Sequence, residues 1–125
     1  MYLGSIYFLL VSVVHAVGLK IPGLYIYYNV PSYAYQDRVI SFLVFGWSVF
    51  FFLTAKSPAL SQIKSILIMG FAAIIMLAFI NLQTDFAAFS VAMDTTVFHA
   101  QVGILFLYWF WLLAGYLKLK HEKGP

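Results

Sequence analysis

Hydrophobic residues fall into four long runs along the chain, and short polar segments separate them. The runs cover residues 2–19, 39–55, 65–82 and 97–117, and none of them contains Lys, Arg, Asp or Glu. A hydrocarbon core of roughly 30 Å is crossed by about 20 apolar residues in a helix. Because lipid offers no partner to backbone polar groups, helices are favoured over open strands. The pattern predicts an all-α integral membrane protein in which residues 1–125 form a single four-helix transmembrane bundle.

Composition agrees with a lipid environment. Hydrophobic residues make up 64% of the 125 residues and charged residues 9%, whereas soluble domains contain about 25% charged residues. A soluble domain of this size could not bury so much apolar surface. The chain has no cysteine, which excludes disulfides, thiolate nucleophiles and Cys-ligated metals. The net charge of +3 comes from few groups, so no nucleic-acid partner is expected.

Lysine and arginine are distributed unequally between the two sides of the predicted bundle. The side with both termini and the second connection carries Lys56, Lys64, Lys118, Lys120 and Lys123. The opposite side carries only Lys20 and Arg38. Cytoplasmic loops are enriched in basic residues. We therefore expect both termini in the cytoplasm, and we expect the protein in a prokaryotic inner or cell membrane.

A tyrosine-rich stretch, KIPGLYIYYNVPSYAYQDR at residues 20–38, separates the first two runs. It holds five of the nine tyrosines, and tyrosine favours the boundary between membrane and water. Pro22 and Gly23 end the first helix, and Pro31 prevents a long regular element. The stretch predicts a short interfacial helix or a loop whose tyrosines form an aromatic belt. The alternative is a lid over a cavity that opens outward.

Polar side chains gather at one level of the predicted bundle. Alternating helix direction brings the end of the first and third runs and the start of the second and fourth to the outer side. The candidate ligand-binding residues at this level are His15, Asp37, Arg38, Asn81, His99 and Gln101. Ionisable groups within membrane spans usually face the protein interior and have partners. The inner half of the bundle is expected to be aliphatic and aromatic.

Three interpretations of the histidines remain open. The first is structural, with an interhelical hydrogen bond from His15 to Asn81 or Gln101. The second makes His15 and His99 the axial ligands of a b-type haem. The third is a pocket for an amphiphile, in which Arg38 holds an anionic head group and a histidine moves a proton. A transition-metal site would need a third ligand, such as Asp85 or Asp94, and none is predicted.

Two short stretches carry a family resemblance. The polar end of the first run, HAVGLKIPG, and the charged start of the second, DRVISFLVFGW, are followed by a short inner turn. This plan resembles the small four-helix membrane proteins called DoxX-like. The resemblance implies a four-helix bundle and, for some members, association with respiratory or redox complexes. It implies no catalytic residues.

The leading functional interpretation is a non-catalytic accessory subunit or a binder of a lipophilic molecule, with no cofactor. Its expected partners are membrane lipids, further copies of the chain or other membrane subunits. The alternatives are a haem b electron carrier or membrane enzyme that uses His15 and His99, and a small oligomeric transporter. The sequence has no Walker, Rossmann or nucleophile-elbow motif. It also lacks the centrally broken helices of inverted-repeat transporters.

Overall fold

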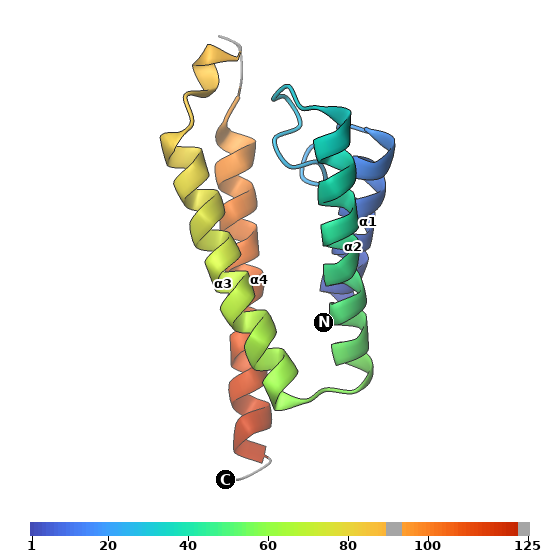
Figure 1. Cartoon of the computed structure of the whole chain (residues 1–125). Helices are drawn as coiled ribbons and strands as arrows, with labels where there is room; N and C mark the ends of the chain where they lie inside the picture. Colours follow the sequence, from blue (N-terminus) through green and yellow to red (C-terminus); the bar gives the residue numbers. More distant parts are fainter. Residues whose placement is uncertain (90–93, 123–125) are drawn as a thin grey trace.

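The computed structural model consists of four long helices that run alternately in opposite directions (Figure 1). It describes residues 1–89 and 94–122. The helices are α1 (Tyr2–Val17), α2 (Ala34–Lys56), α3 (Leu60–Gln83) and α4 (Thr96–Glu122), with a short 3-10 helix η1 (Phe86–Ala88) before α4. The prediction of an all-α chain with four helices is confirmed. Three of them, α2, α3 and α4, are long and apolar enough to cross a membrane, and α1 is a shorter apolar helix.

The two ends of the molecule differ in character. One end, called here the loop end, holds the tyrosine loop (residues 18–33) and the connection from α3 to α4 (Figure 1). The other end, called the lysine end, holds the start of α1, the turn between α2 and α3, and the end of α4. Lys123, which entered the charge prediction, and residues 90–93 lie outside the described residues.

Local sequence sets where the helices begin and end. Gly18 closes α1 in the left-handed conformation, with φ 73°, which glycine adopts without steric cost. The second helix starts at Ala34, ahead of the apolar run, and therefore includes a polar first turn. Asp37 in that turn favours the positive end of the helix dipole. At α4 the Asp94 carboxylate accepts the Thr96 N–H at 2.9 Å, and hydrogen bonds from Thr96 lower the pKa of Asp94.

Two serine pairs join α1 to α2. The Ser5 hydroxyl donates to the Ser48 carbonyl at 2.9 Å, and the Ser48 hydroxyl donates back to the Ser5 carbonyl at 2.8 Å. Further along, the Ser12 hydroxyl donates to the Ser41 carbonyl at 3.0 Å. Each helix places its serines two turns apart and therefore on one face. Small side chains of this kind allow helices in lipid to approach closely.

The expectation of an aliphatic and aromatic inner half is wrong. The Ser5–Ser48 pair lies in the half of the first hairpin toward the lysine end, and both residues are buried. Thr54, near the end of α2, is 0% exposed. Hydroxyl side chains are short and hydrogen-bond to nearby backbone, so they can lie inside an apolar interface. Hydroxyl side chains interrupt neither the hydropathy pattern nor the charge pattern of the apolar runs. The prediction for the inner half of the bundle, which was based on these patterns, therefore missed them.

The helices associate as two hairpins, α1–α2 and α3–α4. The first hairpin is packed along its length, the second less extensively, and α2 and α3 touch little. In the second hairpin the Trp109 indole N–H donates to the Leu67 carbonyl at 2.8 Å. The backbones of α1 and α4 stay apart over the described residues. The contacts of the tyrosine loop and of a few long side chains therefore join the two hairpins.

Candidate functional site

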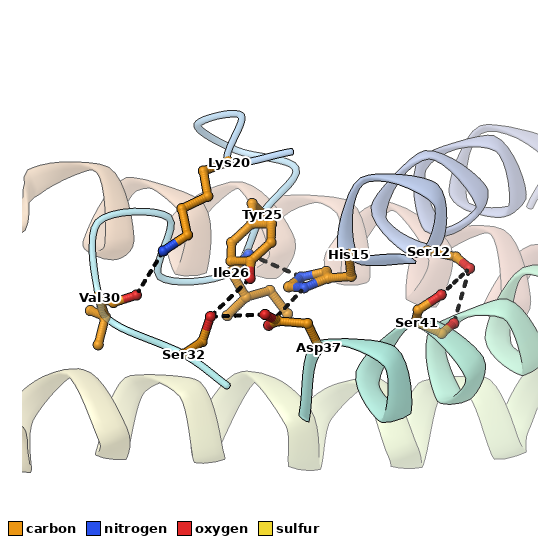
Figure 2. A network of polar contacts seen from close by, with 9 residues as sticks. All are labelled: Ser12, His15, Lys20, Tyr25, Ile26, Val30, Ser32, Asp37 and Ser41. Atoms are coloured by element: carbon orange, nitrogen blue, oxygen red, sulfur yellow. Dashed lines mark hydrogen bonds and ion pairs between the residues drawn. The ribbon is translucent and has the colours of Figure 1, made fainter. Parts of the chain in front are cut away.

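His15 is the centre of a buried polar cluster at the loop end (Figure 2). Its side chain is 1% exposed and lies between the first turn of α2 and the tyrosine loop. His15 Nε2 accepts the backbone N–H of Ile26 at 3.3 Å. His15 Nδ1 lies 3.7 Å from Asp37 Oδ1. The Tyr25 ring stacks on the imidazole, with 4.1 Å between ring centroids.

These contacts assign the imidazole proton. Because Nε2 accepts a hydrogen bond from Ile26, the proton of a neutral ring is on Nδ1 and faces Asp37. The 3.7 Å separation is too long for a hydrogen bond, so the attraction of Nδ1–H to the carboxylate is electrostatic. Nε2 is thus engaged by the loop backbone, while Nδ1 is buried and has no hydrogen bond among the described residues. Proton transfer to a substrate or ligation of haem iron by Nε2 requires Ile26 to move away.

Asp37 connects the histidine to the loop side chains. The Ser32 hydroxyl donates to Asp37 Oδ2 at 2.9 Å, and Tyr25 and Ser32 share a hydrogen bond of 3.0 Å between their hydroxyls. The carboxylate is buried, and a buried charge is stable only with hydrogen-bond or ionic partners. Lys20 sits over the Tyr25 ring at 5.8 Å from its centroid. The cluster therefore fastens the tyrosine loop to the first hairpin.

Tyr27 fastens the same loop to the second hairpin. Its hydroxyl donates to Asn81 Oδ1 at 2.7 Å. Its ring packs against Phe86 and Phe98, at centroid distances of 5.6 Å and 5.0 Å. The backbone of Tyr27 has φ 55°, a conformation that non-glycine residues rarely adopt. Burial raises the pKa of Tyr27, which keeps the hydroxyl neutral and able to donate.

Replacing Tyr27 by phenylalanine is expected to weaken the junction between the hairpins. The change removes the donor and leaves the buried Asn81 carbonyl oxygen without it, at a cost of about 1 kcal/mol. The matched control is Tyr28→Phe, because the Tyr28 ring also contacts Phe98 while its hydroxyl makes no hydrogen bond within the described chain. Unfolding by SDS in mixed micelles measures both variants. Equal stability of the two would show that the Tyr27–Asn81 bond does not hold the hairpins.

The structure brings some of the predicted site residues together and separates others. His15 and Asp37 meet, but His15 hydrogen-bonds to neither Asn81 nor Gln101, which were its predicted partners. Asn81 instead binds Tyr27. His15, Asn81 and His99 line neither the groove between α1 and α4 nor the cavity at the lysine end, which are described below. The tyrosine loop, and not a neighbouring helix, supplies the hydrogen-bond partners of His15 and Asn81.

The remaining predicted residues lie outside the buried cluster. Arg38 and His99 are exposed on α2 and α4. Asp85, considered as a metal ligand, accepts the Ala87 N–H and caps η1, and Asp94 caps α4 in the same way. Gln101 donates from Nε2 to the Tyr7 hydroxyl at 3.3 Å. Of the predicted residues, Gln101 is therefore the one that reaches a cavity.

The five tyrosines of residues 20–38 divide into two groups. Tyr25 is buried and Tyr27 and Tyr28 are half-buried, so these rings cover the cluster and the hairpin junction. Tyr33 and Tyr35 are exposed and stack on each other, with 5.8 Å between centroids. The first group packs against the helices over polar side chains, and the alternative of a lid over an outward-opening cavity stays a prediction.

A groove of about 420 Å³ lies between α1 and α4. Its walls are almost entirely apolar, and Gly23 of the tyrosine loop contributes to them. The lining residues are Leu3, Gly4, Tyr7, Gly23, Val97, Ala100, Gln101, Ile104, Leu105 and Tyr108. The Tyr7 hydroxyl donates to the Gly23 carbonyl at 3.0 Å and accepts from Gln101. The Tyr108 hydroxyl is buried against Gly4 and has no hydrogen-bond partner among the described residues.

Sequence reasoning missed this groove, apart from Gln101. The available signal was small residues on facing helices, Gly4 on α1 and Ala100 on α4, beside the one amide in the fourth apolar run. Ligand sites are typically concave and mostly apolar, with few convergent polar groups. The groove has this character. Its shape and lining suit a hydrocarbon chain that ends in a small polar group near Tyr7 and Gln101.

A scan against protein-family models found no match, and searches of curated proteins and of solved structures found no similar protein. The resemblance to DoxX-like proteins therefore stays a prediction from sequence pattern. The function of the chain is argued below from its own geometry and charge.

Proposed function

We propose that the protein is an integral membrane protein that binds the apolar chain of an amphiphile in the groove between α1 and α4. Three helices long and apolar enough to cross a membrane support the placement in lipid. Large apolar side chains are exposed along all four helices, for example Leu10, Phe42, Ile68 and Leu107. Water would leave these side chains unfavourably hydrated, whereas lipid chains solvate them.

The proposed orientation places the lysine end in the cytoplasm. Of the described residues at that end, Lys56, Lys64, Lys118 and Lys120 are basic and Glu122 is acidic. The loop end carries Lys20 and Arg38 against Asp37, Asp85 and Asp94. Basic residues in short loops and tails favour the cytoplasmic side. The tyrosine loop then faces the periplasm or the exterior.

The groove is the observation on which the binding proposal rests. Its lining is apolar except near Tyr7, Gln101 and the hydroxyl of Tyr108. A ligand with one polar end and an extended hydrocarbon or isoprenoid chain matches that distribution. A non-catalytic role agrees with the His15 cluster, because Nε2 accepts the Ile26 N–H and the imidazole is buried under the tyrosine loop.

Photo-crosslinking tests the groove directly. The protein is placed in phosphatidylcholine nanodiscs with palmitic acid that carries a diazirine, and labelled peptides are mapped by mass spectrometry. Label is expected to concentrate on the groove walls, such as Tyr7 and Ile104. Ala100→Phe fills the groove and is expected to reduce this label to background, whereas Ala72→Phe, on an exposed face of α3, leaves it unchanged.

A different labelling pattern would contradict the proposal. Uniform labelling of the lipid-facing surfaces, with the same pattern in Ala100→Phe and Ala72→Phe, would show only annular lipid and would reject the groove as a binding site.

A further inference from the structure

A second cavity, of about 350 Å³, lies at the lysine end. All four helices and the turn between α2 and α3 contribute to its wall. The lining residues are Met1, Tyr2, Thr54, Ala55, Pro58, Ile63, Trp111, Leu112, Gly115, Tyr116 and Leu119. It shares no residue with the groove between α1 and α4. The two sites therefore lie at different depths of the proposed membrane protein.

The lysines of the lysine end do not line this cavity but lie next to its lining residues in sequence. Every lysine of the described lysine end is a direct sequence neighbour of a lining residue. Lys56 follows Ala55, Lys64 follows Ile63, and Lys118 and Lys120 flank Leu119. Lysine side chains are long and flexible, and they lay an apolar stem along the surface while the ammonium group reaches toward polar partners. Among the described residues at this end, Glu122 is the one acidic side chain.

One hydroxyl group of the cavity wall lacks a hydrogen-bond partner among the described residues. The Thr54 hydroxyl belongs to a lining residue, is fully buried and has no hydrogen-bond partner in the part of the chain that the structure describes. The start of α3 adjoins the lining residue Pro58, and its N-cap, Ala59, provides no side-chain hydrogen bond. The first N–H groups of a helix attract anions when no cap satisfies them.

We propose that the cavity holds one anionic phospholipid molecule, with the phosphate among the lysines and the start of α3. The glycerol and first acyl segments would lie along Trp111, Leu112 and Gly115. Basic pockets between membrane helices on the cytoplasmic side are a recognised environment for anionic head groups. The inference rests on placement of the chain in a membrane with the lysine end in the cytoplasm. It does not depend on the occupant of the α1–α4 groove.

Native mass spectrometry provides the test, with palmitoyl-oleoyl phosphatidylglycerol and phosphatidylcholine as probes. The two lipids have the same acyl chains, so a difference reports the head group. For the wild-type protein in mild detergent, the first phosphatidylglycerol molecule is expected to bind roughly tenfold more tightly than the first phosphatidylcholine. Equal binding of the two lipids would overturn the proposal.

Two glycines of α4 offer a matched pair of variants. A β-carbon added at Gly115 or at Gly103 meets no neighbouring atom within 4 Å, so a larger side chain can start from either position without a clash at its base. Gly115 lines the cavity and Gly103 does not. Gly115→Leu is expected to abolish the preference for phosphatidylglycerol, and Gly103→Leu is expected to keep it. A preference that survives in Gly115→Leu would place the lipid on the lysine surface and overturn the cavity site.

The double variant Lys118→Gln with Lys120→Gln changes exposed side chains and leaves the helix contacts intact. It is expected to lower the preference for phosphatidylglycerol. An unchanged preference would contradict the role of the lysines. Ala100→Phe, which fills the other groove, is expected to leave the lipid preference unchanged, so failure of one site is distinguishable from failure of the other.

Discussion

Replacing His15 by alanine is expected to release the tyrosine loop and to lower the free energy of unfolding by about 3 kcal/mol. The substitution removes the acceptor of the Ile26 N–H, the partner that faces Asp37 and the surface on which Tyr25 stacks. The Ile26 N–H and the Tyr25 ring then lose these partners, and Asp37 keeps only the hydrogen bond from Ser32 among those described above. Unfolding by SDS in mixed micelles gives the stability. Hydrogen–deuterium exchange reports opening of the tyrosine loop. In the variant, the Ile26 amide is expected to exchange much faster than in the wild-type protein.

Two further histidine variants make this result specific. His15→Gln keeps an acceptor near the position of Nε2 and is expected to retain part of the stability and of the Ile26 protection. His99→Ala, at an exposed position of α4, is expected to change the free energy of unfolding by less than about 0.5 kcal/mol. If His15→Ala were as stable as His99→Ala with Ile26 still protected, the cluster would not fasten the loop.

The alanine variants of His15 and His99 also test the haem alternative. A haem protein shows a Soret band, and ligation by both histidines requires that either alanine variant lose it. The arrangement described above, with Ile26 bound to His15 Nε2 and His99 exposed, leads us to expect no such band in the purified protein. A band that both substitutions abolish would show that the loop moves away and that the histidines serve a cofactor.

Replacing Gly4 by alanine is expected to destabilise the protein by about 2 kcal/mol, in spite of the higher helix propensity of alanine. A β-carbon at this position would lie 2.5 Å from the Tyr108 hydroxyl and 2.6 Å from the Phe51 ring. The Tyr108 side chain can move, but Phe51 is buried and packs against Phe8, with 5.2 Å between centroids. Either α1 shifts away from α2, or the aromatic cluster rearranges. Unfolding in mixed micelles measures the loss.

A control and a compensating change accompany the Gly4 variant. Gly46→Ala, on α2, introduces a methyl group where no atom lies within 4 Å, and it is expected to be neutral or slightly stabilising. Phe51→Leu removes the ring that obstructs the new methyl group. In a double-mutant cycle, the Gly4→Ala penalty is expected to be smaller in the Phe51→Leu background. Additive effects of the two substitutions would rule out the steric explanation.

The helices could be predicted from sequence because their signal is strong and local. Runs of 17 or more residues without charge leave a helix as the only backbone arrangement that satisfies itself in lipid. Charged first turns, such as the one that holds Asp37, extend helices beyond the apolar runs, so the boundaries were less accurate. The serine pairs had a readable signal in the seven-residue spacing of Ser5 and Ser12 and of Ser41 and Ser48.

The candidate site was harder to predict because its partners are backbone groups and loop side chains. His15 and Asp37 stood out as ionisable groups at one level of the bundle. Nothing in the sequence identifies the Ile26 N–H as the group that His15 accepts, because every residue except proline carries such a donor. The left-handed conformation of Tyr27 also has no sequence signal, yet it directs that ring toward Asn81.

Arg38 and His99 show a further limit of predicting a site from sequence. Their chemistry suggested a role, but a role also depends on the direction in which a side chain leaves its helix. Asp37 and Arg38 are adjacent in sequence and therefore separated by about 100° around the helix axis. One is buried and the other exposed as a result.

The length of α1 has a consequence for the thickness of the surrounding bilayer. The helix has 16 residues and extends about 24 Å, whereas a typical hydrocarbon core is roughly 30 Å thick. In the proposed membrane placement, the returning tyrosine loop occupies the remaining depth. Irregular backbone is tolerated there only when protein groups satisfy it, which explains why an imidazole accepts the Ile26 N–H. A bilayer that matched the length of α4 would draw this loop further into the hydrocarbon. Hydrophobic mismatch should therefore favour thinner, short-chain lipid regions around the first hairpin.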